Sequence, residues 1–472
     1  MSGITLMTHE RTIIQGGTIV TAESEFLGDL LIVGEHIAAL GADLPPSPDD
    51  RIIDASGCIV LPGVIDAHTH IQLDTGMYQT PDDWQVGTTA AACGGVTTVI
   101  DFATQFPGQS LAQAVRNRWQ EAESAVIDYG LHCMITDLPP GREDELGELV
   151  ELGLPSIKLY TTYRVLSPSK GKPNYYADDA TLTRLLRAAG ERGILTTVHC
   201  ENDALVTAAT KALVEAGDVG LANHGRARPA LAEVKAVNRV LFLAQAVHAP
   251  VYIVHCSVAR SVELVAQAWA QGQVAFAETC PQYLLLDESV YAGADPHRFI
   301  LQPPLRAVEN NQALWDLIQA GVVDVIASDS CDYSLAQKTA HTTFTKTPGG
   351  LPGIETLLPL MASYGVAQGR LDWSDLARLL STNPARIFGL YPTKGALMPN
   401  ADADVTLYDP GYRHTLSADE LHGLARYTPF EGFTLQGRVN MTLSRGQVIY
   451  ADGEFKGRPG RGKFVAGQPI RM

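Results

Sequence analysis

Two kinds of hydrophobic pattern divide the chain. Residues 1–61 and 391–472 contain short apolar segments that alternate with polar residues and are separated by Gly and Asp, which is typical of β-strands. Neither end has enough strands to cover its own apolar face, so we expect both ends to combine into one small β-sandwich domain. In residues 62–390, apolar β-branched runs alternate instead with helical patterns.

Eight apolar runs in this middle part are candidate strands. They cover residues 64–70, 96–102, 131–136, 156–161, 194–200, 251–256, 274–280 and 324–329. Helical periodicity fills the intervals, as at 178–193 and 228–247, and a first helix is expected to begin at Pro81 behind a Thr80 N-cap and to stop at Gly94. Strand followed by helix, eight times over, predicts an α/β fold with a (β/α)8 TIM-like barrel over residues 62–390.

Charge and cysteine content restrict the partners. The chain has 35 Lys and Arg against 52 Asp and Glu, a net charge of −17. We therefore expect no nucleic-acid partner and no anionic membrane partner, because both require basic patches. No apolar stretch is long enough for a membrane span, and the seven scattered cysteines form no C-x-x-C pair. These features favour a cytoplasmic protein with free thiols.

Potential metal ligands fall at the ends of the candidate strands. They are His68 and His70 on the first strand, Lys158 on the fourth, His199 on the fifth, His255 on the sixth and Asp329 on the eighth. In a (β/α)8 barrel these ends converge on one mouth, where active sites lie. A single histidine is more often structural, but this joint pattern predicts a site for Zn²⁺ or a similar divalent ion.

Lys158 lies inside an apolar strand, where a charged amine is costly to bury. Two interpretations are open. The lysine pairs with an acid in the barrel floor, or its pKa is depressed and the neutral amine reacts with CO2. The second reaction gives an anionic carbamate able to bridge two metal ions.

Several motifs resemble the amidohydrolase superfamily. They are D-A-H-T-H at 66–70, S-I-K-L-Y-T-T-Y at 156–163, H-C-E-N at 199–202, Y-I-V-H-C-S at 252–257, E-T-C-P-Q-Y-L at 278–284 and S-D at 328–329. More narrowly, the chain resembles the dihydropyrimidinase/hydantoinase family over nearly its whole length. This similarity includes T-P-D-D-W at 80–84, Q-P-P-L-R at 302–306, L-P-G-I-E at 351–355 and S-R-G-Q-V-I-Y at 444–450.

The resemblance implies a binuclear centre, with zinc the expected metal. His68 and His70 would bind one ion, His199 and His255 the other, carboxylated Lys158 would bridge them, and Asp329 would complete the first ion's ligands. It also implies hydrolysis of a small cyclic amide, with metal-bound hydroxide opening a hydantoin or dihydropyrimidine ring. A homotetramer is a further implication.

Other roles carry over by position. Tyr163, five residues after Lys158, would donate its hydroxyl to the developing oxyanion, although without the resemblance it could be a rim aromatic that only packs. Asp329 would move a proton from the bridging hydroxide to the leaving nitrogen. Gln302 and Gly349 match positions whose backbone contacts the substrate ring.

Departures from the family pattern leave substrate choice open. The family usually has Ser where Gln302 stands, Asn where Gly349 stands, and His where Ser330 follows the catalytic Asp. The long loop 164–176 is expected to shape the pocket for the substrate's exocyclic group, with an ordinary surface loop as the alternative.

Three alternatives to a hydantoinase remain. Allantoinase is a close one. Dihydroorotase is less favoured, because that family tends to have Arg at the position of Gln72 to clamp a carboxylate. The third is a non-catalytic tetrameric scaffold of the same fold, which in its known examples lacks the metal ligands that this chain keeps.

Overall fold

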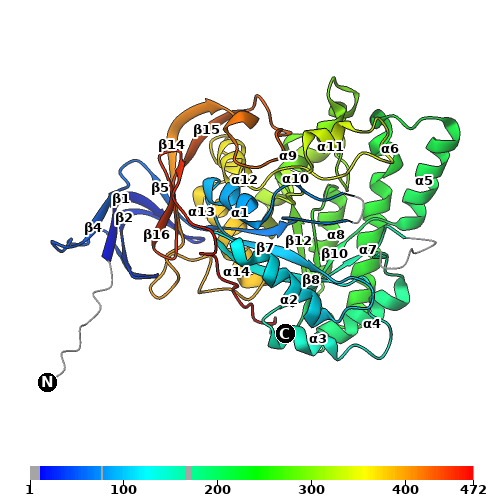
Figure 1. Ribbon diagram of the computed structural model, residues 1–472, viewed down its shortest axis with the longest axis horizontal. Helices are drawn as coiled ribbons and strands as arrows, with labels where there is room; N and C mark the ends of the chain where they lie inside the picture. The colour runs from blue at the N-terminus through cyan, green and yellow to red at the C-terminus, as the bar shows by residue number, and fades with distance from the viewer. Residues whose placement is uncertain (1–10, 76–77, 165–172, 471–472) are drawn as a thin grey trace.

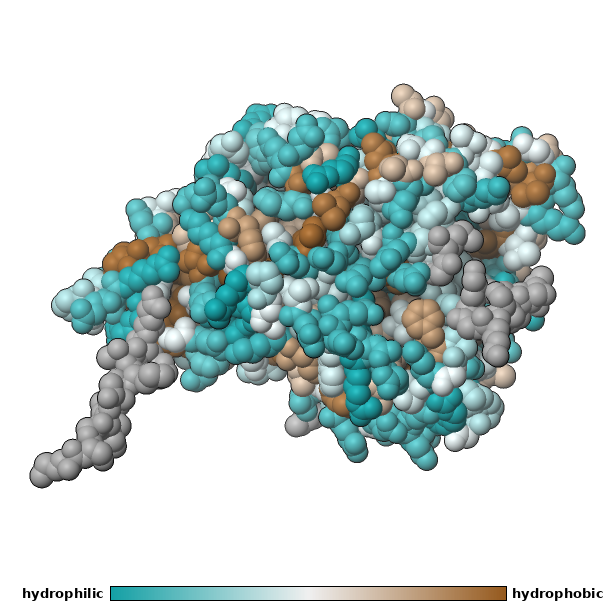
Figure 2. All heavy atoms as spheres, viewed as in Figure 1, coloured by the Kyte–Doolittle hydropathy of each residue, from teal (hydrophilic) through white to brown (hydrophobic). Residues whose placement is uncertain are grey.

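The computed structural model describes residues 11–75, 78–164 and 173–470. A barrel surrounded by helices forms one side of the molecule, and a second sheet, which contains the first strands of the chain, forms the other (Figure 1). The face in Figure 2 is largely hydrophilic, with hydrophobic side chains in separate patches, one of them over the terminal sheet. Within the described ranges, every helix is too short or too polar to cross a lipid bilayer.

All eight predicted barrel strands are present. They are β6 (Val64–Thr69), β7 (Val96–Thr104), β8 (Asp128–Met134), β9 (Ser156–Tyr160), β10 (Leu195–His199), β11 (Val251–Ile253), β12 (Ala275–Thr279) and β13 (Val325–Ile326). Neighbouring strands pair in chain order and are all parallel. The first and last strands meet through a parallel bridge between Thr69 and Ser330, where His70 N donates to Ser330 O over 2.8 Å. The carboxyl ends of the strands therefore surround one mouth.

Helices connect the barrel strands and follow the last of them. They are α1 (Trp84–Cys93), α2 (Leu111–Glu121), α3 (Glu145–Glu151), α4 (Asp179–Gly190), α5 (Asp203–Ala216), α6 (His224–Ala227), α7 (Ala230–Ala246), α8 (Ala259–Ala270), α9 (Pro281–Leu285), α10 (Val308–Gln319), α11 (Leu335–Thr339), α12 (Leu357–Met361), α13 (Trp373–Ala377) and α14 (Asn383–Ile387). In α4 the buried face carries Leu182, Leu185 and Leu186, spaced as an amphipathic helix requires.

The start of the first helix was predicted wrongly. Asp83, not Thr80, is the N-cap, and its carboxylate accepts from Val86 N over 2.8 Å. Thr80 Oγ1 instead accepts from Leu73 N over 2.8 Å and so stabilises the preceding loop. The helix ends at Gly94 as expected. Both Thr and Asp are good N-caps, and only the path of the loop decides which one reaches a free amide.

The second sheet is built from both ends of the chain. Its nine strands are β1 (Arg11–Val20), β2 (Glu25–Val33), β3 (His36–Gly41), β4 (Arg51–Asp54), β5 (Ile59–Pro62), β14 (Val405–Thr415), β15 (Thr434–Ser444), β16 (Gln447–Ala451) and β17 (Glu454–Phe455). Strand β5 joins the two ends, because it pairs with β1 on one side and β14 on the other. The predicted barrel with a terminal β-domain is thus confirmed, while its boundaries at residues 61 and 391 stay predictions.

Two features attach this sheet to the barrel. The buried ammonium of Lys394 lies 2.6 Å from Asp128 of β8, 2.9 Å from Asp402 and 2.7 Å from Asp404. The last part of the chain then runs along the barrel, where Val465 N donates to Tyr129 O over 2.8 Å.

Candidate metal centre and substrate cavity

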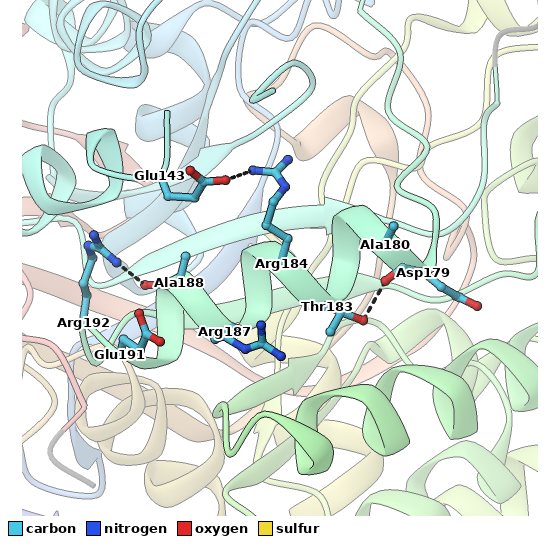
Figure 3. Close-up of a pocket in the computed structure, with 9 residues that line it drawn as sticks. All are labelled: Glu143, Asp179, Ala180, Thr183, Arg184, Arg187, Ala188, Glu191 and Arg192. Carbon is cyan, nitrogen blue, oxygen red and sulfur yellow. Dashed lines mark hydrogen bonds and ion pairs between the residues drawn. The ribbon is translucent and has the colours of Figure 1, made fainter. Parts of the chain in front are cut away.

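A cavity of about 490 Å³ opens at the barrel mouth. The predicted site residues that line it are His70, Tyr163, His199, His255, Gln302, Asp329 and Gly349. A wider depression of about 630 Å³ lies on the outer face of α4 (Figure 3), but it contains none of the predicted residues. Its Arg184 is already paired with Glu143 over 2.5 Å. The cavity at the barrel mouth is therefore the candidate active site.

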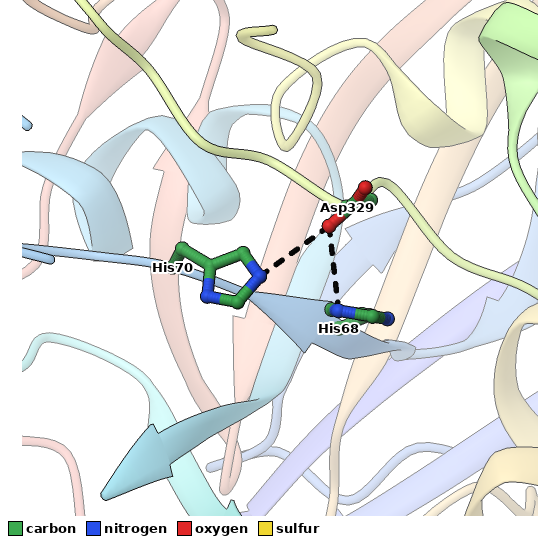
Figure 4. Close-up of side chains that lie close together, drawn as sticks. All are labelled: His68, His70 and Asp329. Carbon is green, nitrogen blue, oxygen red and sulfur yellow. Dashed lines mark ion pairs between the residues drawn. The ribbon is translucent and has the colours of Figure 1, made fainter. Parts of the chain in front are cut away.

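The first predicted metal-binding group is assembled (Figure 4). His68 Nε2 and His70 Nε2 lie 3.3 Å and 3.4 Å from the same oxygen of Asp329. One ligand atom from each of the three residues lies within 4.8 Å of the others, which suits a shared divalent ion. His68 is on β6 and His70 directly follows its last residue, Thr69, so the two side chains are two residues apart and both reach toward the mouth.

The second group lies beside the first. His199 Nδ1 and His255 Nε2 are 3.0 Å apart, and the rings of His68 and His255 are 5.2 Å apart between centroids. His199 Nε2 lies 2.9 Å from a carboxylate oxygen of Glu201, so a proton on Nε2 leaves the Nδ1 lone pair directed at His255. Burial, above all, lowers the pKa of both histidines and keeps them neutral. Two neutral imidazole nitrogens at this spacing suit a common cation.

Two buried glutamates orient these histidines, and we had not predicted either role. Glu278 Oε1 lies 2.7 Å from His68 Nδ1 and also accepts from His255 N over 2.8 Å. Glu201 binds His199 and forms an ion pair with Arg228. Burial alone would raise the pKa of Glu201, but Arg228 and His199 lower it to about 2. The sequence did contain a signal for both roles. Glu201 stands two residues after the predicted ligand His199, and Glu278 stands at the end of the strand that neighbours the His255 strand.

Lys158 is buried between the two groups. Its side chain is inaccessible to solvent, and in the described part of the chain its Nζ has neither a hydrogen-bond partner nor an ion-paired acid. Burial lowers the pKa of Lys158 to about 8, so a substantial neutral fraction exists near physiological pH. The structure thus does not support the paired-lysine interpretation. A neutral, unpartnered amine is the state that reacts with CO2.

Three predicted site residues have a strained backbone. Tyr163, His255 and Asp329 have φ values of 67°, 37° and 49°, in the left-handed region that side chains rarely adopt. Each such residue costs on the order of 1–3 kcal/mol, and this strain persists where surrounding structure enforces it, often at functional sites.

Tyr163 faces the metal-binding groups from the loop after β9. Its ring centroid is 5.3 Å from that of His199 and 5.1 Å from the guanidinium carbon of Arg228. Burial raises the pKa of the Tyr163 hydroxyl above its usual range, so the group keeps its proton and can donate it in a hydrogen bond.

Gln302 and Gly349 face each other across the cavity wall. A Cβ atom on Gly349 would come within 2.0 Å of Gln302 Oε1, so the glutamine side chain fills the space that a side chain at 349 needs. Of the predicted loop 164–176, residues 165–172 lie outside the described residues. Pro173 and Tyr175 of the remainder do line the cavity.

The donor set fits two divalent metal ions. His68 Nε2, which lies beside Asp329, is a further buried nitrogen without a hydrogen-bond partner among the described residues, in addition to Lys158 Nζ. Buried polar groups are normally paired, and a bound cation accounts for such orphans beside one cavity. Imidazole and carboxylate donors together suit Zn²⁺ and related ions.

Known proteins match this chain over nearly its whole length. Residues 59–449 match the amidohydrolase family. The chain is 42% identical to a D-phenylhydantoinase of Escherichia coli O1:K1, an alignment that covers 98% of this chain and 99% of that protein.

Solved structures agree. The dihydropyrimidinase of Brevibacillus agri NCHU1002 superposes with a TM-score of 0.94 at 35% identity, covering 98% of this chain and 100% of that one. The L-hydantoinase (dihydropyrimidinase) of Arthrobacter aurescens superposes with a TM-score of 0.88 at 28% identity, covering 97% and 100%.

Proposed function

The chain belongs to the amidohydrolase family, and from this membership and the geometry of the mouth we infer that it is a metal-dependent enzyme that hydrolyses the C–N bond of cyclic amides. The observation that carries this function is that His70, His199, His255 and Asp329 line one cavity, where buried His68 lies 3.3 Å from Asp329. Lys158 is fully buried on β9, the barrel strand that neighbours the His199 strand. When bound there, divalent ions supply Lewis-acid chemistry, which lowers the pKa of a water molecule and polarises the substrate carbonyl.

The chain's own groups complete the reaction. Asp329 Oδ1 lies beside His68 and His70, at the position where a carboxylate can take a proton from the attacking water. It can pass that proton to the ring nitrogen as the C–N bond breaks. Tyr163 donates a hydrogen bond to the carbonyl oxygen as negative charge develops on it. The cavity wall at Gln302 and Gly349 holds the ring against these groups.

We further propose that two ions bind per chain, that zinc is the metal, and that a carbamate on Lys158 is the ligand common to both. Support comes from the buried, unpartnered Nζ and from the position of the histidines in two groups. Elemental analysis of protein purified without chelator should approach two metal equivalents per chain. A value near zero, with no activity after adding Zn²⁺, Mn²⁺ or Co²⁺, would reject the binuclear centre.

The cavity favours a ring with an aromatic exocyclic substituent. Tyr78, Tyr175, Tyr333 and Leu73 line it together with the metal-binding groups. Aromatic side chains offer flat apolar faces on which a phenyl group can pack. We therefore propose 5-substituted hydantoins as the preferred substrates, in line with the name of the D-phenylhydantoinase relative.

A turnover panel on metal-reconstituted protein tests this choice. It compares both enantiomers of 5-phenylhydantoin with unsubstituted hydantoin, dihydrouracil, dihydrothymine and allantoin. The phenyl compound should have the highest kcat/KM. Allantoin as the best substrate would favour the allantoinase alternative, and no turnover of any compound would reject the proposed activity.

A homotetramer and a cytoplasmic location are also proposals. Phe242 on α7 and Trp269 on α8 are 68% and 69% exposed, and these two helices pack against each other. Large apolar side chains on adjacent helices provide a surface that another copy of the chain can cover. Light scattering at micromolar concentration should give four times the mass of the chain, and a monomer would reject this assembly.

A further inference from the structure

Lys338 is a second buried lysine near the mouth, and it contacts no acid in the described part of the chain. It lies on α11, and its side chain is inaccessible to solvent. Its Nζ donates to three backbone carbonyls: Ile300 O over 2.5 Å, Pro348 O over 2.9 Å and Gly350 O over 2.8 Å. An ammonium has three N–H donors, so this cage satisfies all of them.

The three carbonyls belong to the two loop segments that form one wall of the cavity. Ile300 precedes Gln302 by two residues, and Pro348 and Gly350 flank Gly349. The segments are also joined directly, because Gly350 N donates to Ile300 O over 3.0 Å. Lys338 does not line the cavity. Its side chain therefore binds the wall segments without being part of the cavity surface.

Helix α11 is itself held firmly, which makes it a suitable support. Ser334 and Gln337 form a capping box at its first turn, and Leu335 N donates to Ala425 O over 2.9 Å. Gln337 Nε2 donates to Gln79 O over 2.8 Å, next to Tyr78 of the cavity lining. One short helix thus contacts several segments that line the substrate cavity.

Burying this lysine has a clear cost. Desolvation lowers the pKa of Lys338 to about 7. The three carbonyl acceptors oppose this lowering of the pKa. They favour the protonated amine, because a neutral amine has too few N–H donors to satisfy all three. A costly cation without an acid partner indicates that the position of the wall depends on it.

We propose that Lys338 is a positioning residue, which fixes the segments at Gln302 and Gly349 in the register needed to hold the substrate ring. This role rests on the proposed function, since the wall is a substrate-binding wall only if cyclic amides bind there.

The test compares Lys338→Met with Lys394→Met, a matched loss of a buried ammonium at the junction of barrel and sheet. Lys338→Met should raise KM on the order of tenfold, leave kcat within about threefold of the parent, and retain its metal content. Amide hydrogen exchange at residues 300–302, 349 and 350 should accelerate in this variant. Lys394→Met should lower Tm but leave KM and exchange in these segments unchanged.

Hydrogen exchange needs no turnover, so it separates this proposal from the proposed function. Faster exchange confined to Lys338→Met supports the positioning role even if no cyclic amide is hydrolysed. Unchanged exchange and an unchanged KM in Lys338→Met would overturn it, whatever the loss in Tm. If the Met variant does not fold, Lys338→Gln, which keeps two N–H donors, should show the same effects more weakly, and parental behaviour in that variant would also overturn the proposal.

Discussion

Replacing Glu278 by Gln should weaken metal binding without disturbing the barrel. The carboxylate accepts three hydrogen bonds, from His68 Nδ1 over 2.7 Å, His255 N over 2.8 Å and Tyr252 Oη over 2.8 Å. The first of these holds the proton of His68 on Nδ1 and leaves Nε2 free for a metal ion. Gln can keep all three contacts if its oxygen faces the histidines and the Tyr252 hydroxyl turns to accept. The substitution therefore removes the charge alone.

The size of the effect follows from this geometry. Charge-assisted hydrogen bonds are roughly twice as strong as neutral ones, and loss of such a partner of a metal-binding histidine typically reduces metal affinity about 10–100-fold. We expect Glu278→Gln near the lower end of that range. Glu278→Ala should reach the upper end, because it leaves His68 and His255 donors buried without an acceptor. Tyr252→Phe, which removes one donor and keeps the carboxylate, should stay within about threefold of the parent.

Chelator competition followed by elemental analysis measures these affinities without any substrate. Burial raises the pKa of Glu278 to about 8. A proton on Glu278 competes with its role toward His68, so metal affinity in the parent should rise as the pH increases through about 8. Glu278→Gln should lose that part of the pH dependence. Parental affinity and an unchanged pH profile in Glu278→Gln would show that the carboxylate does not control His68.

Substitutions at four further positions test the remaining roles. Tyr163→Phe should lower kcat by about 10²–10³-fold with little change in KM or metal content, because it deletes one oxyanion donor and keeps the ring; a rate within threefold of the parent would make Tyr163 a packing residue. Lys158→Ala should lose metal and activity together, and Lys158→Arg should not restore them, since guanidinium forms no carbamate; full activity in either would refute the bridge. Gly349→Asn alone should raise KM because its Cβ meets the Gln302 side chain, and adding Gln302→Ser should recover much of the loss; strictly additive effects would exclude this packing.

Much of the site was readable from local sequence. The proposed ligands His68, His70, His199 and Asp329 could be placed because strand ends follow from hydrophobic runs and β/α alternation brings those ends to one mouth. That argument needs only the period of the hydrophobic pattern and the order of strands and helices along the chain, and a single sequence contains both. The same reasoning found both halves of the terminal sheet, since neither could bury its apolar face alone.

Only the tertiary structure decided which groups support these ligands. Glu278 and His68 are 210 residues apart in the chain, and Lys338 reaches carbonyls 38 and 12 residues away. The hydrophobic periodicity of the sequence contains no information on such contacts, because they depend on how loops and strand ends meet in space. The complementarity of Gln302 and Gly349 is of the same kind: each residue looked like an isolated departure, and their packing shows why they occur together. Sequence determined where the chemistry gathers, and three-dimensional packing determined its protonation, its support and the shape of its cavity.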